Sequence, residues 1–252
     1  MKAMILAAGL GTRLRPLTDD RPKALVEING RTLLEITLSC LHKFGVSEVI
    51  INVHHFADMI VDYLKTNNNF GMRIEISRED ILLDTGGGLK KAAHFFAGGS
   101  IRPDSSGQEP FIVHNVDVLS AIDLQRLVQF HAENQALASL AVQDRKTSRY
   151  LLFDDHLQLS GRRLGNDRPE LVGGREHAQS LAFSGIHVIS PRLLPMMIED
   201  GAFSIIDTYL RLASQGEKIL AFRADEYYWR DLGRPEDVAQ AAKDLKQKAI
   251  AQ

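Results

Sequence analysis

The stretch that decides the fold is Ile5 to Leu25, ILAAGLGTRLRPLTDDRPKAL, near the start of a chain of 252 residues. A short apolar strand runs there into a turn with Gly9 and Gly11, whose backbones can take positive φ and approach a ligand closely. Successive N–H groups of such a turn point at anionic oxygens, and Arg13 and Lys23 add positive charge. The pattern predicts a phosphate-binding turn at the end of the first strand.

Two common nucleotide-binding motifs do not fit this turn. No Gly-Lys-Ser/Thr follows the glycines, and Leu14 stands where a GxGxxG motif has its last glycine. A glycine pair after a strand is by itself more often an ordinary tight turn. The added Arg13, Arg15, Pro22 and Lys23 favour the phosphate-binding interpretation.

Apolar runs of strand character alternate with helical patterns over the first part of the chain. Strands are expected at Ala3 to Leu6, Val49 to Val53, Arg73 to Ser77, Phe111 to Asn115 and Ala138 to Val142. Helices are expected at Leu33 to Phe44, Ala57 to Lys65, Leu89 to Phe96 and Leu124 to Glu133. This alternation with short connections is typical of an α/β fold with a mainly parallel sheet.

The pattern changes after about residue 145. RYLLFDDHLQLSGRR predicts two short strands around a turn at Asp155 and His156, and LAFSGIHVI predicts another strand, so antiparallel additions are expected. The stretch 97–109, rich in Gly, Ser, Pro and Asp, is expected to be a loop. Because no internal repeat or linker divides the chain, we expect one domain over 1–252.

Composition limits the class of protein. With 44% hydrophobic residues and a mass of 28.1 kDa the chain can bury a large core, and a formal net charge of −2 gives no reason to expect binding to nucleic acid or an anionic membrane.

The single cysteine, Cys40, allows no intrachain disulfide and is expected to be a buried helix thiol in a reducing compartment. No secretory leader precedes the first motif and no apolar run could span a bilayer, so a cytoplasmic location is expected.

A second motif, LLDTGGGLKKAA, places Asp84, Thr85 and three glycines just before the helix expected from Leu89. A glycine-rich entry to a helix exposes N–H donors and the positive end of the helix dipole, which suits an anion or the edge of a base. The alternative is a flexible helix start. Beside the first motif, the ligand-binding interpretation gains weight.

Two carboxylates have the positions that a metal site requires. Asp117 follows the strand Phe111 to Asn115, and the carboxyl ends of parallel strands are where open α/β sheets bind ligands. Taken alone, such an aspartate is more often a loop residue or a helix cap. Asp231, in YYWRDLGRPEDV, supplies a second carboxylate, and one or two carboxylates plus substrate phosphates are the usual ligands of Mg²⁺.

Residues 7–25 resemble the N-terminal signature of the sugar-1-phosphate nucleotidyltransferases, also called NDP-sugar pyrophosphorylases: Gly-x-Gly-Thr-Arg-Leu-x-Pro-Leu-Thr followed by Pro-Lys. The form DTGGG looks most like the branch of N-acetylmuramate-1-phosphate uridylyltransferases and mannose-1-phosphate guanylyltransferase-like proteins. The resemblance covers Met4 to about Asp237. It implies a Rossmann-like three-layer α/β/α fold with a mainly parallel mixed sheet and a small antiparallel addition in the second half.

The resemblance also implies site residues in two halves, 1–145 for the nucleotide and 146–252 for the sugar and a C-terminal helix. Arg13 and Lys23 would contact the phosphates and, with Asp117, form the catalytic set. The implied nucleotide-binding residues are Leu6, Ala7, Ala8, Gly9, Gly11, Thr12, Arg13, Lys23, Glu79, Thr85, Gly86 and Gly87. Glu79 would accept a hydrogen bond from the base or, equally, be a solvated loop carboxylate, and Gly86 and Gly87 would let the base lie against the backbone.

On the acceptor side the resemblance implies Mg²⁺ on Asp117 and Asp231, and Gly185 near the sugar. The family usually has Gly-Asp where this chain has Asn115-Val116-Asp117, so Asn115, like the preceding histidine, is a candidate for substrate contact. A Glu-Lys-Pro segment whose lysine meets the sugar phosphate is absent. Arg162 or Arg163 would supply that charge, unless they are a solvated hairpin pair.

The implied reaction is attack by a sugar 1-phosphate on the α-phosphorus of a nucleoside triphosphate, with release of pyrophosphate. We expect UTP and N-acetylmuramate 1-phosphate as the substrates. The alternatives are a mannose-1-phosphate guanylyltransferase, a phosphocholine-type cytidylyltransferase and a non-catalytic nucleotide-sensing module. A monomer or small homo-oligomer that binds neither nucleic acid nor membrane is expected.

Overall fold

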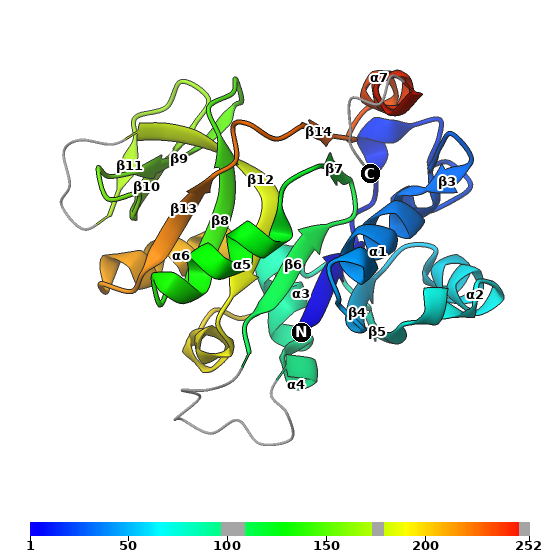
Figure 1. The fold of residues 1–252 in the computed structure, drawn as a ribbon, viewed down its shortest axis with the longest axis horizontal. Helices are drawn as coiled ribbons and strands as arrows, with labels where there is room; N and C mark the ends of the chain where they lie inside the picture. The colour runs from blue at the N-terminus through cyan, green and yellow to red at the C-terminus, as the bar shows by residue number, and fades with distance from the viewer. Residues whose placement is uncertain (97–108, 173–178, 247–252) are drawn as a thin grey trace.

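The computed structural model describes residues 1–96, 109–172 and 179–246. In these residues a ten-stranded sheet has the strand order β11-β10-β9-β12-β6-β1-β4-β5, with β8 pairing with β12 and β13 with β8 (Figure 1). Its strands are β1 (Lys2–Leu6), β4 (Glu48–Val53), β5 (Arg73–Arg78), β6 (Phe111–Asn115), β8 (Ala138–Gln143), β9 (Arg149–Phe153), β10 (Leu159–Leu164), β11 (Glu170–Leu171), β12 (Gln179–Ile189) and β13 (Ile219–Arg223). The loop expected over 97–109 lies, apart from its last residue, outside the described residues.

Helices and short elements connect these strands. The helices are α1 (Leu33–Lys43), α2 (Ala57–Thr66), α3 (Asp84–Lys91), α4 (Ala93–Phe96), α5 (Leu124–Glu133), α6 (Ile205–Ser214) and α7 (Pro235–Lys246). The short 3₁₀ turns are η1 (Thr12–Leu14), η2 (Lys23–Leu25), η3 (Asn68–Gly71) and η4 (Pro191–Met196). Two small ribbons pair β2 (Glu27–Ile28) with β3 (Arg31–Thr32), and β7 (Val118–Ser120) with β14 (Trp229–Asp231).

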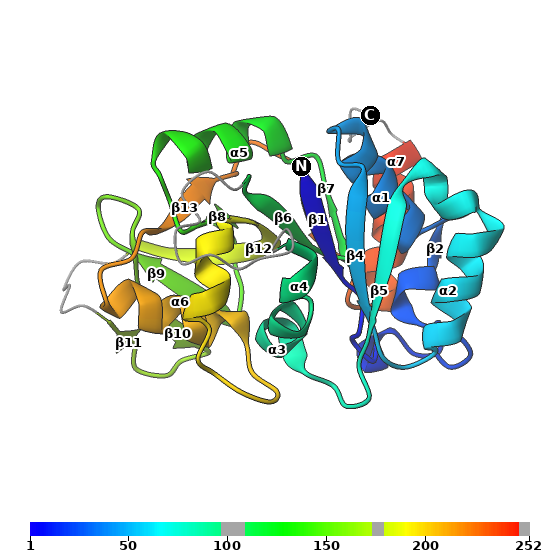
Figure 2. The ribbon, with the colours of Figure 1, turned by 90° about the horizontal axis from the view of Figure 1, so that it is seen from below.

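Strands β6, β1, β4 and β5 form a parallel body, in which β6, β1 and β4 are buried on both faces and β5 is the edge strand. Ala3 and Ile5 of β1 pack in one core with residues of α1, α2, α5 and α7, whereas Met4 packs in a second core with residues of α3, α4 and α6. Strands that are buried on both faces have largely apolar sequences, as β1, β4 and β6 do. Figure 2 shows α1, α2 and α7 on one side of β4 and β5, with α3 and α4 on the other. The three-layer α/β/α fold with a mixed central sheet is confirmed.

The antiparallel part of the sheet is larger than the small addition expected. β12 runs antiparallel to β6, β8 and β9, and β10 runs antiparallel to β9 and β11. β12 pairs with β9 up to Ala182 and with β6 from Ile186 onward, and Gly185 lies between the two segments with φ of 73°. This one long strand therefore joins the parallel body to the sheet of the second half.

The helix that carries the glycine motif begins earlier than expected. α3 begins at Asp84 rather than near Leu89, so the three glycines are part of its first turns and are buried. A Cβ on Gly86 would lie 2.3 Å from the ring of Phe203, and one on Gly87 would lie 2.4 Å from the carbonyl oxygen of Gly201. The glycines are therefore needed for close packing of this helix against segment 201–203, which is distant in the sequence.

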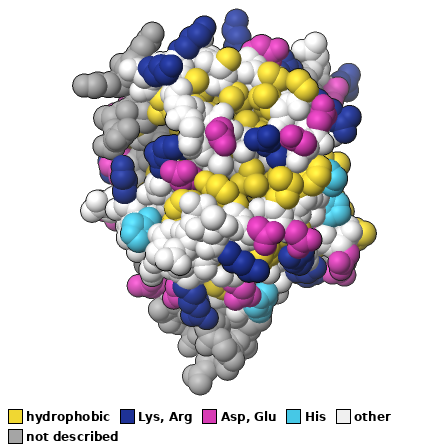
Figure 3. All heavy atoms as spheres, turned by 90° about the vertical axis from the view of Figure 1, so that its right-hand side faces the viewer, with side chains coloured by type: hydrophobic (Ala, Val, Ile, Leu, Met, Phe, Trp, Pro, Cys, Tyr) yellow, Lys and Arg dark blue, Asp and Glu magenta, His cyan; other side chains and the backbone are white. Residues whose placement is uncertain are grey.

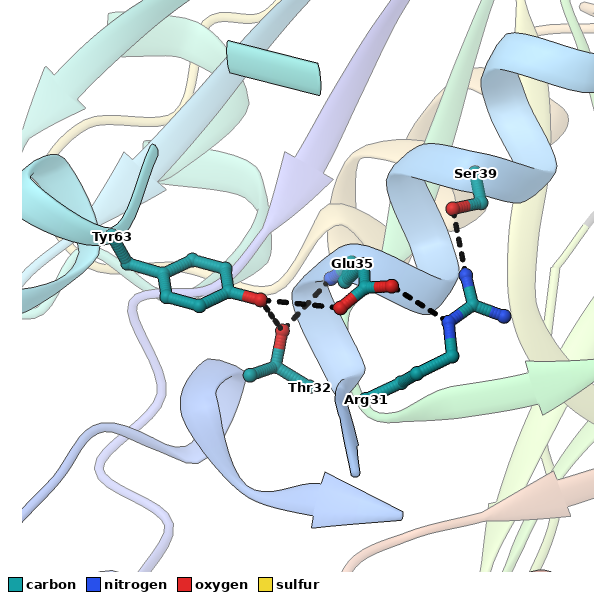
Figure 4. A network of polar contacts seen from close by, with 5 residues as sticks. All are labelled: Arg31, Thr32, Glu35, Ser39 and Tyr63. Atoms are coloured by element: carbon teal, nitrogen blue, oxygen red, sulfur yellow. Dashed lines mark hydrogen bonds and ion pairs between the residues drawn. The ribbon is translucent and has the colours of Figure 1, made fainter. Parts of the chain in front are cut away.

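A polar network fixes the N-terminus of α1 against α2 (Figure 4). Thr32 is the N-cap residue of α1, and its hydroxyl accepts a hydrogen bond from the Glu35 N–H (3.0 Å) and donates one to the Tyr63 hydroxyl (3.1 Å). The Glu35 carboxylate accepts from the Tyr63 hydroxyl (3.3 Å) and pairs with Arg31 (2.7 Å), whose other end donates to Ser39 (2.8 Å). The network satisfies a helix terminus and joins two helices.

Replacement of Thr32 by alanine is expected to lower the free energy of unfolding by about 1 kcal/mol, because it removes an N-cap acceptor from a buried helix start. Urea denaturation at neutral pH measures this change. Ser39→Ala is the matched control, since it removes only the outermost hydrogen bond of the same network and is expected to stay within about 0.5 kcal/mol of wild type. Equal losses in the two variants would contradict the capping role of Thr32.

Two imidazoles lie buried at the middle of the sheet. His114 on β6 and His187 on β12 are 3% and 1% exposed, and Nδ1 of His187 lies 2.6 Å from the Tyr209 hydroxyl. Burial lowers the pKa of His114 to about 4, while burial and the charge of His114 lower the pKa of His187 to about 3. His114 is therefore a neutral core residue, and the possibility that it contacts substrate is not supported.

The stability of the protein is expected to fall as the pH drops below about 6.5. An unfolded histidine binds a proton near that pH, whereas the folded His114 resists protonation down to a pKa of about 4, so the unfolded state binds more protons in this window. Each such imidazole contributes a slope of up to about 1.4 kcal/mol per pH unit. Denaturation midpoints between pH 7 and pH 4.5 measure the slope. The slope should become less steep by the share of one imidazole in His114→Gln, because His131 and His187 remain, and it should be unchanged in His42→Gln, whose imidazole is exposed.

Other expectations concern the surface. Cys40 lies on α1 and is only half-buried, although burial raises the pKa of its thiol. No helix in the described part of the chain is long and apolar enough to cross a membrane. Acidic and basic side chains are mixed over the face that Figure 3 shows, so no field of a single sign covers that side.

Candidate active site

A cavity of about 590 Å³ opens beside the carboxyl ends of β1 and β6, the edge where α/β sheets bind ligands. The nucleotide-binding residues predicted from sequence that line it are Leu6, Ala7, Ala8, Gly9, Gly11, Thr12, Arg13, Lys23 and Thr85. The further lining residues are Leu10, Asn52, Leu82, Asp84, Asn115, Val116, Asp117, Ala202 and Gly233. We call this space the first cavity.

The glycine-rich turn closes onto the segment that carries Lys23. Gly11 has φ of 66°, and a Cβ there would lie 3.1 Å from Thr18 Cγ2 and 3.2 Å from Lys23 Cβ. The Thr18 hydroxyl donates a hydrogen bond to the Gly11 carbonyl (2.9 Å). Glycine is therefore favoured at position 11 for two reasons: it adopts the left-handed backbone conformation, and it leaves room for the Lys23 side chain.

A buried amide that the sequence analysis missed holds the start of this turn. Asn52 accepts a hydrogen bond from the Ala7 N–H (2.8 Å) and donates one to Glu79 (2.7 Å). The other oxygen of the Glu79 carboxylate accepts from the Leu83 N–H (3.0 Å). A polar side chain inside the apolar run VIINV is the sequence signal that could have identified Asn52.

This network contradicts one of the two interpretations of Glu79. Its side chain is only 5% exposed, so it is not a solvated loop carboxylate. It is not among the residues that line the first cavity, and its oxygens are already engaged by Asn52 and Leu83. Glu79 therefore holds Asn52 in place, and its hydrogen bond to the base stays a prediction.

Gly86 and Gly87 are not among the residues that line the first cavity, and their expected role behind the base stays a prediction. The N–H of Gly86 donates to the Phe203 carbonyl (2.9 Å), so it is not free for a ligand. Thr85 is at the cavity wall, and its hydroxyl accepts from the Ile205 N–H (3.0 Å). The lack of side chains at the two glycines also allows close packing against segment 201–203, which precedes α6.

Asp117 connects the first cavity to a second one. It follows β6, lines both cavities and forms an ion pair with Lys23. Lys23 is buried, and Arg13 lines both cavities from the exposed face of η1. A lysine, an arginine and a carboxylate that are separated in the sequence thus meet where the two cavities adjoin.

Asp231 reaches the same place from the C-terminal part of the chain. β14 pairs with β7 so that Asp231 lies opposite Val118, and the Leu232 N–H donates to the Asp117 carbonyl (2.8 Å). Burial and the negative charge of Asp117 raise the pKa of Asp231, while the charges of Lys23 and Arg13 oppose the shift. The two carboxylates are therefore close enough to repel each other.

This carboxylate pair has the chemistry of a site for a hard divalent cation. Such a cation relieves the repulsion between the two carboxylates, and oxygen ligands suit Mg²⁺. Among the described residues no group of three or more histidine, cysteine or acidic side chains could hold a metal ion. The remaining ligands of a cation on Asp117 and Asp231 would have to be substrate oxygens and water.

The second cavity has a volume of about 510 Å³ and is walled mainly by the antiparallel part of the sheet. It contains Asn115 and Gly185, as the sequence analysis expected of the sugar side. The other lining residues are Arg13, Asp117, Val118, Arg145, Thr147, Arg149, Tyr150, Leu151, Arg162, Leu164, Phe183, Ser204, Ile206, Trp229 and Asp231. A Cβ on Gly185 would lie 2.8 Å from the Asn115 amide nitrogen, so this glycine makes room for Asn115.

The two arginines expected on the acceptor side differ in position. Arg162 lines the second cavity, but its guanidinium pairs with Glu170 (2.7 Å) and with Asp207 (2.5 Å). Arg163 is not among the lining residues, and its guanidinium lies 4.9 Å from the ring centroid of Tyr150. Carboxylates therefore already neutralise one of these arginines, and the other lies off the cavity wall.

Arg145 is a cavity residue that the sequence analysis missed. Its guanidinium lies 3.6 Å from the ring centroid of Trp229, and its Nη2 donates to the Phe183 carbonyl (2.7 Å). β8 runs in the same direction as β6, because both are antiparallel to β12, so Arg145 follows the end of β8 as Asp117 follows the end of β6. A charged residue just after an apolar strand is the signal that could have identified it.

A family model described as nucleotidyl transferase matches residues 2–158, which is more than half of the chain. The chain belongs to the nucleotidyl transferase family. The matched range contains the glycine-rich turn, Lys23 and Asp117, which meet in the first cavity. Asp231 lies beyond the matched range and is brought to the site by the pairing of β14 with β7.

Curated relatives of this nucleotidyl transferase act on different sugar phosphates. The chain is 32% identical over 243 residues to the N-acetylmuramate alpha-1-phosphate uridylyltransferase of Caulobacter vibrioides, covering 93% of this chain and 92% of that protein. It is 29% identical over 266 residues to the UTP--glucose-1-phosphate uridylyltransferase of Synechocystis (99% and 64% covered). It is 30% identical over 241 residues to the mannose-1-phosphate guanyltransferase of Yarrowia lipolytica (94% and 62% covered). The chain thus spans less than two thirds of the latter two relatives.

Solved structures share the fold of this nucleotidyl transferase. HddC from Yersinia pseudotuberculosis, complexed with GMP-PN, has a TM-score of 0.75 at 23% identity, with 97% of this chain and 99% of that chain covered. A UDP-glucose pyrophosphorylase complexed with UDP-glucose has a TM-score of 0.77 at 18% identity, with 98% of each chain covered. At these identities the likeness is one of fold.

Proposed function

We propose that this nucleotidyl transferase transfers a uridylyl group from UTP to N-acetylmuramate 1-phosphate and releases pyrophosphate. The observation that carries the proposal is the pair of adjoining cavities that share Arg13, Asn115 and Asp117. A nucleoside triphosphate would occupy the first cavity and a sugar 1-phosphate the second, with their phosphates meeting at the shared residues. The choice of UTP and this sugar is supported by the uridylyltransferase relative, which the chain covers almost completely.

The reaction needs positioning and charge neutralisation more than proton transfer. An oxygen of the sugar 1-phosphate attacks the α-phosphorus, the new P–O bond forms, and the bond from the α-phosphorus to the pyrophosphate oxygen breaks. Because the attacking phosphate is ionised near neutral pH, no general base is required. Arg13 would stabilise the charge that develops on pyrophosphate, and Lys23 would hold the α-phosphate.

We assign Asp117 and Asp231 as the residues that would hold Mg²⁺. When bound, the cation would neutralise the phosphates of both substrates and reduce their repulsion. The chain itself prepares this position, because Lys23 pairs with Asp117 and the Leu232 N–H fixes the backbone after it. Both carboxylates must be ionised for this role.

The proposal includes the organisation expected from sequence. One domain would bind the nucleotide with residues 1–145 and the sugar with residues 146–252. We propose a monomer or small homo-oligomer in the cytoplasm, with no nucleic acid or membrane partner. A second candidate is transfer of a guanylyl group from GTP to mannose 1-phosphate, which the relatives of that activity favour.

Pyrophosphate release across a grid of four nucleoside triphosphates and several sugar 1-phosphates, with Mg²⁺ present, tests the proposal. The grid includes N-acetylmuramate, mannose and glucose 1-phosphates and phosphocholine. Release with UTP and N-acetylmuramate 1-phosphate would support the main proposal, and release with GTP and mannose 1-phosphate would replace it by the second candidate. If a folded protein that binds a nucleoside triphosphate gives no release in any well, a nucleotide-sensing role would replace both.

A further inference from the structure

The second cavity needs a cation for the acceptor phosphate. Two phosphate groups and two carboxylates, those of Asp117 and Asp231, would meet near its inner end, so positive charge from the chain must face the acceptor. Lys23 is already paired with Asp117. Arg162 is paired with Glu170 and Asp207, so an incoming phosphate would have to compete with two carboxylates for it.

Arg145 has the geometry of an anion-binding arginine. Its guanidinium lies 3.6 Å from the centroid of the Trp229 ring, and the Trp229 ring is itself held by a hydrogen bond from Nε1 to the Ser184 carbonyl (2.8 Å). One Nη2 hydrogen bond to the Phe183 carbonyl fixes its orientation. A guanidinium held in this way loses little side-chain entropy when it binds a phosphate with two parallel hydrogen bonds.

The donors of Arg145 are incompletely used. Its Nε is buried and has no hydrogen-bond partner among the described residues, and within those residues no carboxylate forms an ion pair with the guanidinium. Burial lowers the pKa of Arg145, and the charge of Asp231 opposes that shift, so Asp231 lies within electrostatic range. A half-buried cation without an ion pair, beside a carboxylate of the expected metal site, is costly unless an anion comes to it.

We propose that Arg145 binds the phosphate of the sugar 1-phosphate and so replaces the lysine of the absent Glu-Lys-Pro segment. This inference rests on the proposed function, because it takes the acceptor to be a sugar 1-phosphate. The residue approaches the reacting centre from the end of β8, whereas Arg162 and Arg163 lie on β10. Arg149 also lines the cavity, but it is exposed, whereas Arg145 is half-buried and held against Trp229.

Steady-state kinetics of Arg145→Gln and Arg145→Lys test the assignment. The glutamine variant is expected to raise KM for the sugar 1-phosphate by about 10- to 100-fold while KM for the nucleoside triphosphate changes little. The lysine variant keeps the charge without the planar fork and is expected to fall between glutamine and wild type. Arg73→Gln is the matched control, because Arg73 is an exposed arginine on β5 that pairs with Glu48. Equal KM values for the sugar 1-phosphate in wild type and Arg145→Gln would overturn the proposal.

A binding measurement separates a phosphate contact from a sugar contact. Trp229 is the single tryptophan of the chain, so its fluorescence reports directly on the ring that Arg145 covers. We expect a saturable change in fluorescence when wild type is titrated with a sugar 1-phosphate. Arg145→Gln is expected to bind it about 10- to 100-fold more weakly, because the variant loses a charge-assisted contact. The phosphate-free sugar should bind both proteins equally. A loss of affinity that is as large for the free sugar would overturn the phosphate assignment.

The failure of the proposed function gives a different result from the failure of this inference. If wild type turns over no sugar 1-phosphate, the proposed function fails, and Trp229 fluorescence is then titrated with inorganic phosphate. A saturable response that Arg145→Gln abolishes and Arg73→Gln keeps would still support an anion site at Arg145. No response in wild type, or the same response in Arg145→Gln, would overturn it.

Discussion

Turnover is expected to fall by about 10²- to 10³-fold when Asp117 is replaced by asparagine, because one electrostatic contact at the reacting phosphates is removed. The amide keeps the shape of the carboxylate but cannot offer a negative oxygen to a cation. It also leaves the buried Lys23 without its ion-pair partner. We therefore expect both a lower kcat and a higher Mg²⁺ concentration for half-maximal activity.

The control for Asp117→Asn is Asp58→Asn. Asp58 is an exposed carboxylate on α2 that pairs with Arg78, so its loss should leave turnover and the Mg²⁺ requirement unchanged. Thermal unfolding of the Asp117 variant shows whether it remains folded. A folded Asp117→Asn enzyme with wild-type turnover would refute the assignment of this residue to the metal and the phosphates.

Replacement of Arg13 by alanine is expected to lower kcat by about 10²-fold or more, with little change in the free energy of unfolding. The loss of kcat is expected without a loss of stability because the Arg13 side chain is exposed and lines both cavities. The neighbouring Leu14, which is fully buried, anchors η1. The charge that develops on pyrophosphate in the transition state would lose its partner. Single-turnover rates at saturating substrate measure this loss.

Arg192→Ala is the control for Arg13→Ala. It removes an equally large side chain from a surface ion pair with Glu217, and no change in turnover is expected. Arg13→Lys should recover only part of the rate, because a lysine offers charge without the planar set of donors. Full activity in Arg13→Ala would remove this residue from the catalytic set.

The sequence placed the first motif at a cavity because the information in this motif is local. The glycines set the backbone of the turn, and Arg13 and Lys23 lie within the same stretch, so one segment of sequence specifies a cavity wall. The parallel strands β1, β4 and β6 were equally easy to predict, since burial on both faces makes each a largely apolar run. The main differences lay at boundaries, as where α3 begins at Asp84.

The second motif shows what local interpretation misses. Gly86 and Gly87 were expected to let a base lie against the backbone, and the structure shows that they also make room for Phe203 and Gly201. Glu79 was weighed as a ligand or a loop residue, and Asn52, 27 residues away in the chain, makes it part of a buried network. In each case the partner that decides the role is distant in sequence.

By itself the sequence determined the α/β fold, the glycine-rich turn at the first cavity and the two candidate aspartates, because strand burial and motif spacing depend on short stretches of residues. Only the tertiary structure decided which arginines of the second cavity are held in ion pairs. Asp207, 45 residues from Arg162, neutralises that arginine, and the pairing of β14 with β7 brings Trp229 under Arg145. The charge that an arginine presents depends on its neighbours in space, and those neighbours are fixed by the folded chain.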